Sequence, residues 1–243
     1  AVAAGLVVLA LLAFIAFQVR PRQAPVEPMT GKFNIAVADF GEFDPASGQV
    51  RSTRAASAAS QFLTDGLQRE LQDTEGTIPL VRDIQVRHDD STSLITGKTP
   101  AEQAQKAAEL AQKLNAQIVI YGNVAAEENG GDLQVEFYVS PQASEKEFNA
   151  LLGSQALAGS VPLPASFDGS GALTNISVSD QLNLRSRIIF WLTLALTQDL
   201  LGRSDQSLAT LQQAEQYLAD WQESDGKELL YFLQGREHLF LEQ

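Results

Sequence analysis

The sequence predicts one transmembrane helix, followed by an α/β domain with a mixed sheet and then by all-α helical hairpins. Three observations predict this order. Residues 1–19 form one uncharged apolar run, residues 33–140 alternate segments of strand-like and helix-like periodicity, and residues 178–243 keep only the helical period of about 3.6 residues. A linker at 20–32 and a loop at 141–177 are expected to join the three parts.

The composition limits the chemistry that the chain can perform. It has 243 residues, of which 44% are hydrophobic, enough to bury a core in one or two domains. It contains no Cys, which excludes disulfides, zinc–thiolate centres and thiol nucleophiles. Its two histidines, His88 and His238, are too few for a multi-histidine metal or catalytic centre. We therefore expect no enzymatic activity, no metal and no cofactor.

The charge argues against partners with a phosphate backbone. The chain has 17 Lys+Arg against 30 Asp+Glu, a formal net charge of -13. Only one acidic residue, Glu27, precedes residue 33, so the predicted folded part is strongly acidic. No run of basic residues offers a compensating patch. We therefore exclude nucleic acid as a partner.

The apolar run at 1–19 has the length of a membrane-spanning helix. Its one polar side chain is Gln18, and at about 1.5 Å per residue it reaches about 28 Å, close to the hydrocarbon core of a bilayer. The chain begins with Ala1 and has no cleavage site after the run, which favours a retained helix in a chain cut from a longer protein. An uncleaved signal anchor and a buried soluble helix are the alternatives. Arg20 and Arg22 favour a cytoplasmic location for the residues that follow.

The first half of the α/β part is predicted as strand, turn, helix and strand. FNIAVADF at 33–40 alternates and is rich in β-branched and aromatic residues, which is typical of a buried strand. GEFDPASG at 41–48 supplies turn residues. Apolar residues at helical spacing over 55–73 predict an amphipathic helix, and TIPLVRD at 77–83 predicts a second strand.

The second half is predicted as a capped helix and a hairpin. Thr99 can cap the helix at its start, and Asn115 can adopt the left-handed conformation that ends it. Segments 117–128 and 133–140 predict two strands around a Gly-Gly turn. A short extra strand at 151–162 can follow before the chain leaves the domain.

The C-terminal part is predicted as consecutive helices. From residue 178 the apolar side chains lie almost all round a long helix, which Gly202 ends. Ser204 can cap a second, amphipathic helix over 204–220, and a third follows at 227–243.

The first two of these helices resemble a tetratricopeptide repeat (TPR). The residues that carry the resemblance, on the two sides of the turn, are Trp191, Leu194, Ala195, Ser207, Leu211 and Ala214. Tyr231 and Gly235 resemble part of a second, truncated copy, at a longer spacing than the usual repeat of about 34 residues. Gln198 departs from the pattern, because the repeat usually has an aromatic residue there. The resemblance implies a concave surface that binds a protein or peptide.

Residues 33–140 resemble the N-terminal domain of TolB and the related FlgO and CsgG families. The motifs that carry the resemblance are IAVADF (35–40), FLTDGLQREL (62–71) and AQIVIYGNV (116–124). A bacterial arrangement of membrane helix, FNIAVADFG-type strand and TPRs, placed behind a cytoplasmic signalling module, is also similar. That resemblance implies a single-pass protein of the bacterial inner (plasma) membrane with residues 33–243 extracytoplasmic, opposite to the orientation that the two arginines favour.

Candidate contact residues lie in two places. Asp39, Glu42 and Asp44 follow the first predicted strand, and the carboxyl ends of strands often carry ligand sites in α/β folds. These carboxylates could bind a cation or a cationic partner, or they could simply be solvated or bonded within the loop. Trp221 lies in the insertion between the two repeat copies, where exposure would let it contact a partner.

Two further motifs are weighed and rejected. ITGKTP at 95–100 ends like a phosphate-binding loop, but that loop needs a glycine where Thr92 stands and a strand directly before it. A polar loop that leads into a capped helix explains the segment. His88 in RHDD (87–90) could hold a metal, but hydrated charge explains this loop as well.

Two function hypotheses follow. The first is a membrane-tethered, non-catalytic interaction or sensory module that binds a protein or peptide through the repeats and couples it to a module before residue 1. The second is a regulatory or receptor domain that binds a small ligand in the α/β crevice near residues 39–53.

Overall fold

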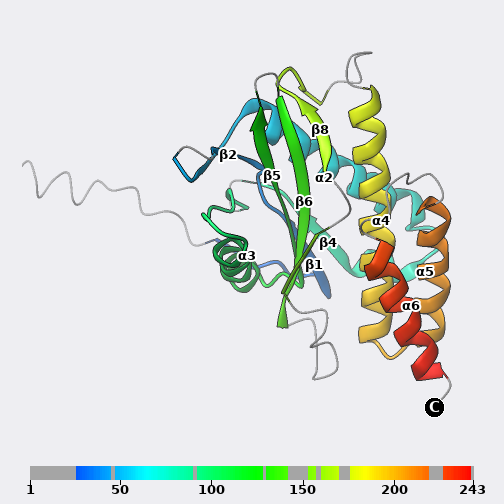
Figure 1. Ribbon diagram of the computed structural model, residues 1–243. Coiled ribbons are helices and arrows are strands. Elements are labelled where there is room, and N and C mark those ends of the chain that lie inside the picture. The colour runs from blue at the N-terminus through cyan, green and yellow to red at the C-terminus, as the bar shows by residue number, and fades with distance from the viewer. Residues whose placement is uncertain are drawn as a thin grey trace, which may run out of the picture.

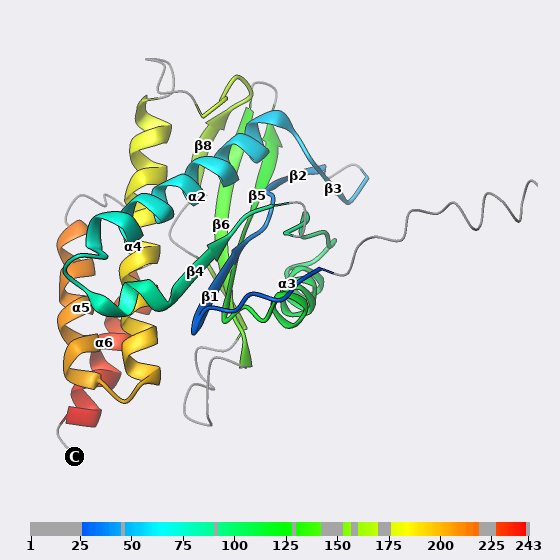
Figure 2. The same cartoon turned by 180° about the vertical axis from the view of Figure 1, so that it is seen from behind.

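A twisted β-sheet forms the centre of the fold in the computed structural model, which describes residues 26–44, 47–89, 92–127, 130–141, 153–156, 160–169, 176–218 and 227–241. Helices α2 (Arg54–Thr74) and α4 (Ile176–Leu200) cover one face of the sheet, and α3 (Pro100–Leu114) lies on the other (Figures 1 and 2). Helices α5 (Ser204–Leu218) and α6 (Lys227–Leu241) pack with α4 into a bundle beside the sheet.

The sheet is built around two long strands. Its strands in chain order are β1 (Phe33–Val37), β2 (Gly41–Asp44), β3 (Gln49–Arg51), β4 (Ile84–Arg87), β5 (Ile118–Glu127), β6 (Gly130–Val139), β7 (Gly153–Ala156) and β8 (Val161–Pro164). β5 and β6 form an antiparallel hairpin, and the other edge of β5 pairs in parallel with β1 and then with β2. β4 extends the sheet beyond β1, β3 extends it beyond β2, and β7 and β8 pair with opposite ends of β6.

The two faces of the sheet bury different side chains. On one face Ile35 packs in a cluster with Leu63 of α2 and Ile189 of α4, and this cluster continues into α5 and α6. On the other face Val119 packs with Leu110 of α3 in a second cluster. Burial of each such aliphatic side chain stabilises the fold by about 1.5–3 kcal/mol. The bundle helices therefore share one core with the sheet.

The two predicted helices of the α/β part are confirmed. α2 and α3 fall within a residue or two of the predicted limits. The Thr99 hydroxyl accepts a hydrogen bond from the Glu102 amide at 3.2 Å, as expected for an N-cap. Asn115 has a φ of 56°, the left-handed conformation expected for the residue that ends the helix.

Two local predictions in this part are wrong. Residues 41–48 were expected to be a turn, but Gly41–Asp44 form β2, because the edge of β5 offers a hydrogen-bonding partner, and the described turn is limited to residues 47–48 before β3. Residues 77–83, expected to be a strand, end in a 3₁₀-helix at Pro79–Asp83, and the strand begins only at Ile84. Pro79 lacks the amide that a strand would use and suits the first position of a helical turn.

The predicted TPRs are not supported. α4 has 25 residues and packs against α2 and β8 as well as α5, so it is part of the sheet's covering layer. Ala195 and Ala214, which matched the repeat, are fully buried in the shared core. Any close antiparallel pair of helices places small residues at such contacts, so the pattern does not by itself specify a repeat.

The predicted fold class also included a membrane helix, and this part is contradicted. Within the residues that the structure describes, no helix has both the length and the apolar character needed to cross a bilayer. The fold is corrected to a mixed α/β sheet with packed helices, and the single-pass membrane location loses its support. Residues 1–19, on which the helix was predicted, lie outside the described part of the chain.

Candidate binding sites

Asp39 lies where the chain passes from β1 to β2. Its side chain is exposed, and its Oδ1 lies 3.7 Å from His88 Nε2. The His88 Nδ1 donates a hydrogen bond of 2.8 Å to the Val37 carbonyl, which fixes the ring against the end of β1. Asp39 and His88 thus tie the end of β1 to the residues that follow β4.

Glu42 and Asp44 do not converge with Asp39 on a common point. Glu42 forms an ion pair with Arg51 on the adjacent strand β3. Asp44 accepts a hydrogen bond of 2.8 Å from the Ser47 hydroxyl at the hairpin end. In the described ranges no group of three His, Cys, Asp or Glu residues is arranged to hold a metal ion. The three carboxylates serve local pairing, and the candidate contact Trp221 lies outside the described residues.

A buried polar contact on the α3 face was missed from the sequence. The Tyr121 hydroxyl lies 2.6 Å from Glu136 Oε2 and 2.7 Å from Ser154 Oγ, which joins β5, β6 and β7. Burial, together with the hydrogen bond to Glu136, raises the pKa of Tyr121 well above its ordinary value. The hydroxyl is therefore a fixed neutral donor. No sequence signal marks it, because the three partners come from separate strands.

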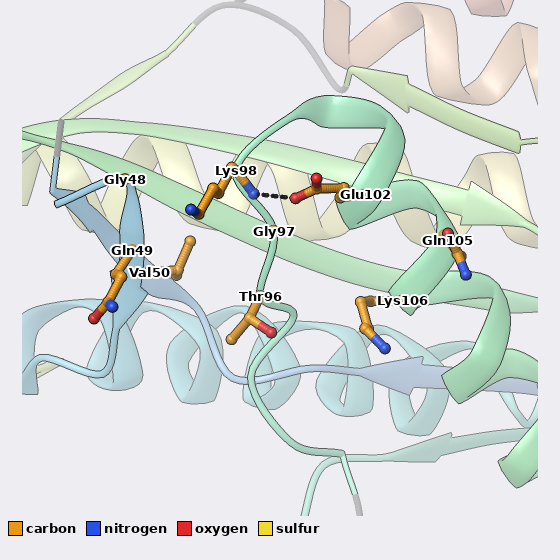
Figure 3. A pocket seen from close by; sticks show the side chains of 9 residues that line it. All are labelled: Gly48, Gln49, Val50, Thr96, Gly97, Lys98, Glu102, Gln105 and Lys106. Carbon is orange, nitrogen blue, oxygen red and sulfur yellow. Dashed lines mark hydrogen bonds between the residues drawn. The ribbon is translucent and has the colours of Figure 1, made fainter.

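A cavity of about 460 Å³ lies between the β2–β3 hairpin and the start of α3 (Figure 3). Its lining residues come from the hairpin, the loop before α3 and the first two turns of α3: Gly48, Gln49, Val50, Thr96, Gly97, Lys98, Glu102, Gln105 and Lys106. The hairpin residues fall in the range 39–53 that the second hypothesis indicated. The loop before α3 was considered only as a phosphate-binding loop, at 95–100, and rejected, and the first turns of α3 were predicted only as a helix.

The start of α3 is closed to a phosphate by its own cap. The Lys98 amide donates to Glu102 Oε2 at 2.7 Å, and the Glu102 amide donates to Thr99. These donors are therefore not free to wrap a phosphate as a phosphate-binding loop requires.

The second candidate surface is formed by the exposed large hydrophobic side chains of α6, which we name the α6 apolar face: Tyr231, Phe232, Leu239, Phe240 and Leu241. Their exposed fractions run from 38% for Phe240 to 64% for Leu239. Among the described residues, the large hydrophobic side chains that are exposed lie on this helix, with the single addition of Leu201 at the turn after α4. Exposed apolar side chains that gather on one element mark binding sites more often than side chains scattered over the whole surface do.

A buried polar network lies beneath this face. Arg236 forms an ion pair with Asp199 of α4, and Glu237, fully buried, accepts a hydrogen bond of 2.9 Å from Ser207 of α5. These contacts join all three helices of the bundle. They also fix the rotation of α6 about its axis.

Comparisons with known proteins do not assign the chain to a family. No family model matches the chain, and a search of curated proteins finds no match. A solved structure, a dodecamer of a PelC point variant from Paraburkholderia phytofirmans, is similar with a TM-score of 0.30 and 14% identity, over 69% of this chain and 93% of that one. A similarity at this level carries no argument, and the resemblance to the TolB, FlgO and CsgG families stays a prediction.

Proposed function

We propose that the chain is a non-catalytic protein-binding module whose contact surface is the α6 apolar face. The observation that carries the proposal is the concentration of exposed aromatic and aliphatic side chains on this one helix. Tyr231 is 50% exposed and Phe232 is 46% exposed, and both aromatic types are enriched at protein interfaces. A partner that covers these side chains removes apolar surface from water.

The orientation of α6 about its own axis also supports the proposal, because the contacts of the helix hold Tyr231 and Phe232 toward solvent. The helix is apolar on both sides, since Leu230 and Leu233 are buried in the core opposite Tyr231 and Phe232. Turning α6 to bury the aromatic side chains would break the contacts of Glu237. Breaking one partner of a buried charged contact costs about 3–5 kcal/mol, so the polar network holds the apolar face toward solvent.

The position of Gly235 favours a helix as the partner. It lies in the middle of α6, and a Cβ built on it meets no heavy atom within 4 Å. Nothing in the described chain therefore needs a glycine here, although glycine inside a helix costs about 1 kcal/mol relative to alanine. A close backbone approach explains the residue, so the partner fits best as an amphipathic helix that crosses α6 at Gly235.

Affinity capture with the full chain as bait tests the proposal. Proteins retained from an extract of the source cells are compared between the wild type and two variants, Gly235→Leu and Phe232→Ser. We expect both variants to lose a protein that the wild type retains, since the first blocks the close approach and the second removes an aromatic contact. Both changes are on exposed positions, so the fold should survive.

Gly76→Leu is the matched control. Gly76 lies in the turn after α2, and a Cβ on it also meets nothing within 4 Å. The control should retain the same protein as the wild type. Equal retention by the wild type, Gly235→Leu and Phe232→Ser would refute the α6 apolar face as the contact surface.

A further inference from the structure

The exposed residues of α6, as far as Leu239, form one arc centred on Gly235. A helix turns by about 100° per residue, which places Gly235 almost opposite the buried Leu233 and Glu237. The helix lies on the outer side of its bundle with α4 and α5 (Figure 1), so the arc points away from the core. The exposed residues within about 60° of Gly235 are Glu228, Tyr231, Phe232, His238 and Leu239.

The arc is nearly the same when α6 is read in either direction from Gly235. Tyr231 and Leu239 lie four residues from Gly235 on the two sides, and Phe232 and His238 lie three residues from it. A surface with this symmetry can meet a copy of itself across a two-fold axis, the commonest arrangement in homo-oligomers. Gly235 then lies at the crossing point, where the absence of a side chain lets two backbones approach closely.

An antiparallel pair of α6 helices matches the side chains of the arc. With the two-fold axis at Gly235, Phe232 of one copy faces Leu239 of the other, and Tyr231 faces His238. An apolar side chain then meets an apolar one, and the Tyr231 hydroxyl meets an imidazole that can hydrogen-bond with it. A parallel pair would place Leu239 against His238 and would align the two helix dipoles unfavourably.

We propose that the protein bound by the α6 apolar face is a second copy of this chain, and that the two α6 helices cross antiparallel at Gly235. This inference rests on the function proposed above and names the partner of the same surface. One helix of 15 residues from each chain is a small interface compared with the roughly 1,200–2,000 Å² of stable complexes, so the pair should dissociate on dilution. Each chain has a net charge of -13, so added salt should favour the pair by screening the repulsion.

Cysteine cross-linking tests the proposal, because the chain has no Cys of its own. Full-length Phe232→Cys and Leu239→Cys variants are oxidised separately and as an equimolar mixture. In the antiparallel pair the two substituted positions face each other, whereas two copies of either one lie about 9–12 Å apart along the helices, too far for a disulfide. We expect the mixture to give at least about tenfold more covalent dimer than either variant alone, because facing cysteines have a high effective concentration.

Gly235→Leu and Gly76→Leu, each added to both cysteine variants, form the matched pair of controls. Gly235→Leu should reduce the yield of the mixture to that of the single variants, since its side chain separates the two backbones. Gly76→Leu should leave the yield unchanged, because Gly76 lies in the turn after α2, and a Cβ there meets nothing within 4 Å. Equal yields from the mixture and the single variants, or no covalent dimer in any sample, would overturn the antiparallel pair.

Affinity capture separates this inference from the proposed function on which it rests. The protein that the wild type retains and Gly235→Leu loses should be the chain itself. If the mixture does not cross-link and the lost protein is a different one, the second copy is overturned and the α6 apolar face remains the contact surface. If the mixture does not cross-link and the variants retain the same proteins as the wild type, both proposals are overturned.

Discussion

Replacing Gly235 by alanine should stabilise the protein, because the structure leaves space for the new methyl group. Gly235 lies inside α6 and is not among the glycines with positive φ. A Cβ on it meets no heavy atom within 4 Å. The substitution therefore gains helix propensity without losing a contact. The free energy of unfolding should rise by about 0.5–1 kcal/mol.

The expected change in melting temperature is small but measurable. A domain of about 150–250 residues shifts by about 2–4 °C for each kcal/mol, so Gly235→Ala should raise the midpoint by about 1–4 °C. Thermal unfolding followed by circular dichroism at fixed pH measures this shift.

Gly66→Ala should instead destabilise the protein and lower its melting temperature. Gly66 lies in α2 where it meets α4, and a Cβ there would come within 2.5 Å of the Ser186 hydroxyl. Overpacking of this kind costs about 1–3 kcal/mol. If Gly235→Ala lowers the melting temperature, or if both variants raise it equally, the interpretation of Gly235 as a residue without an internal packing role is wrong.

Three other substitutions test other parts of the fold. Asp199→Leu should cost up to about 3–5 kcal/mol in urea unfolding, because it removes a largely buried carboxylate that pairs with Arg236, and a loss below about 0.5 kcal/mol would count against this ion pair. Because the folded-state pKa of Tyr121 is raised above its ordinary value of 10.0, its stabilising contribution is present below pH 10 and is lost as the pH rises above it, so Tyr121→Phe should flatten the alkaline fall in stability. Thr99→Ala should cost about 1 kcal/mol by freeing the Glu102 amide, and a loss below about 0.3 kcal/mol would count against the cap.

Part of the candidate sites could be predicted from the sequence. The pattern GKTP marked the loop before α3, and the range 39–53 included the hairpin that forms the opposite wall of the cavity. That these two segments lie together was not predictable, since the hairpin is held by the pairing of β2 with β5 and the loop is held through Gln103, which is bonded to Asn123 of β5. The carboxylates Glu42 and Asp44 were candidate ligands because a sequence does not show that Arg51 and Ser47 lie beside them.

The limits of α2 and α3 followed from the sequence because their signals are local. Period, cap residue and terminal asparagine act over one or two helical turns, and Thr99 and Asn115 take the roles that their residue types favour. The same local reasoning failed at Gly41–Asp44, where turn residues form a strand. Strand formation there depends on the edge of β5, which is about 80 residues away along the chain.

The C-terminal helices separate most clearly what the sequence determined from what the tertiary structure decided. The sequence determined that 227–241 is helical and apolar, because its residue types fix the period. It could not show which apolar side is buried, since the buried Leu230 and Leu233 flank the exposed Tyr231 and Phe232 and all four are apolar. That choice was made by the contacts of α6 with α4 and α5, because a buried charge must meet its partner and only one rotation of the helix allows it.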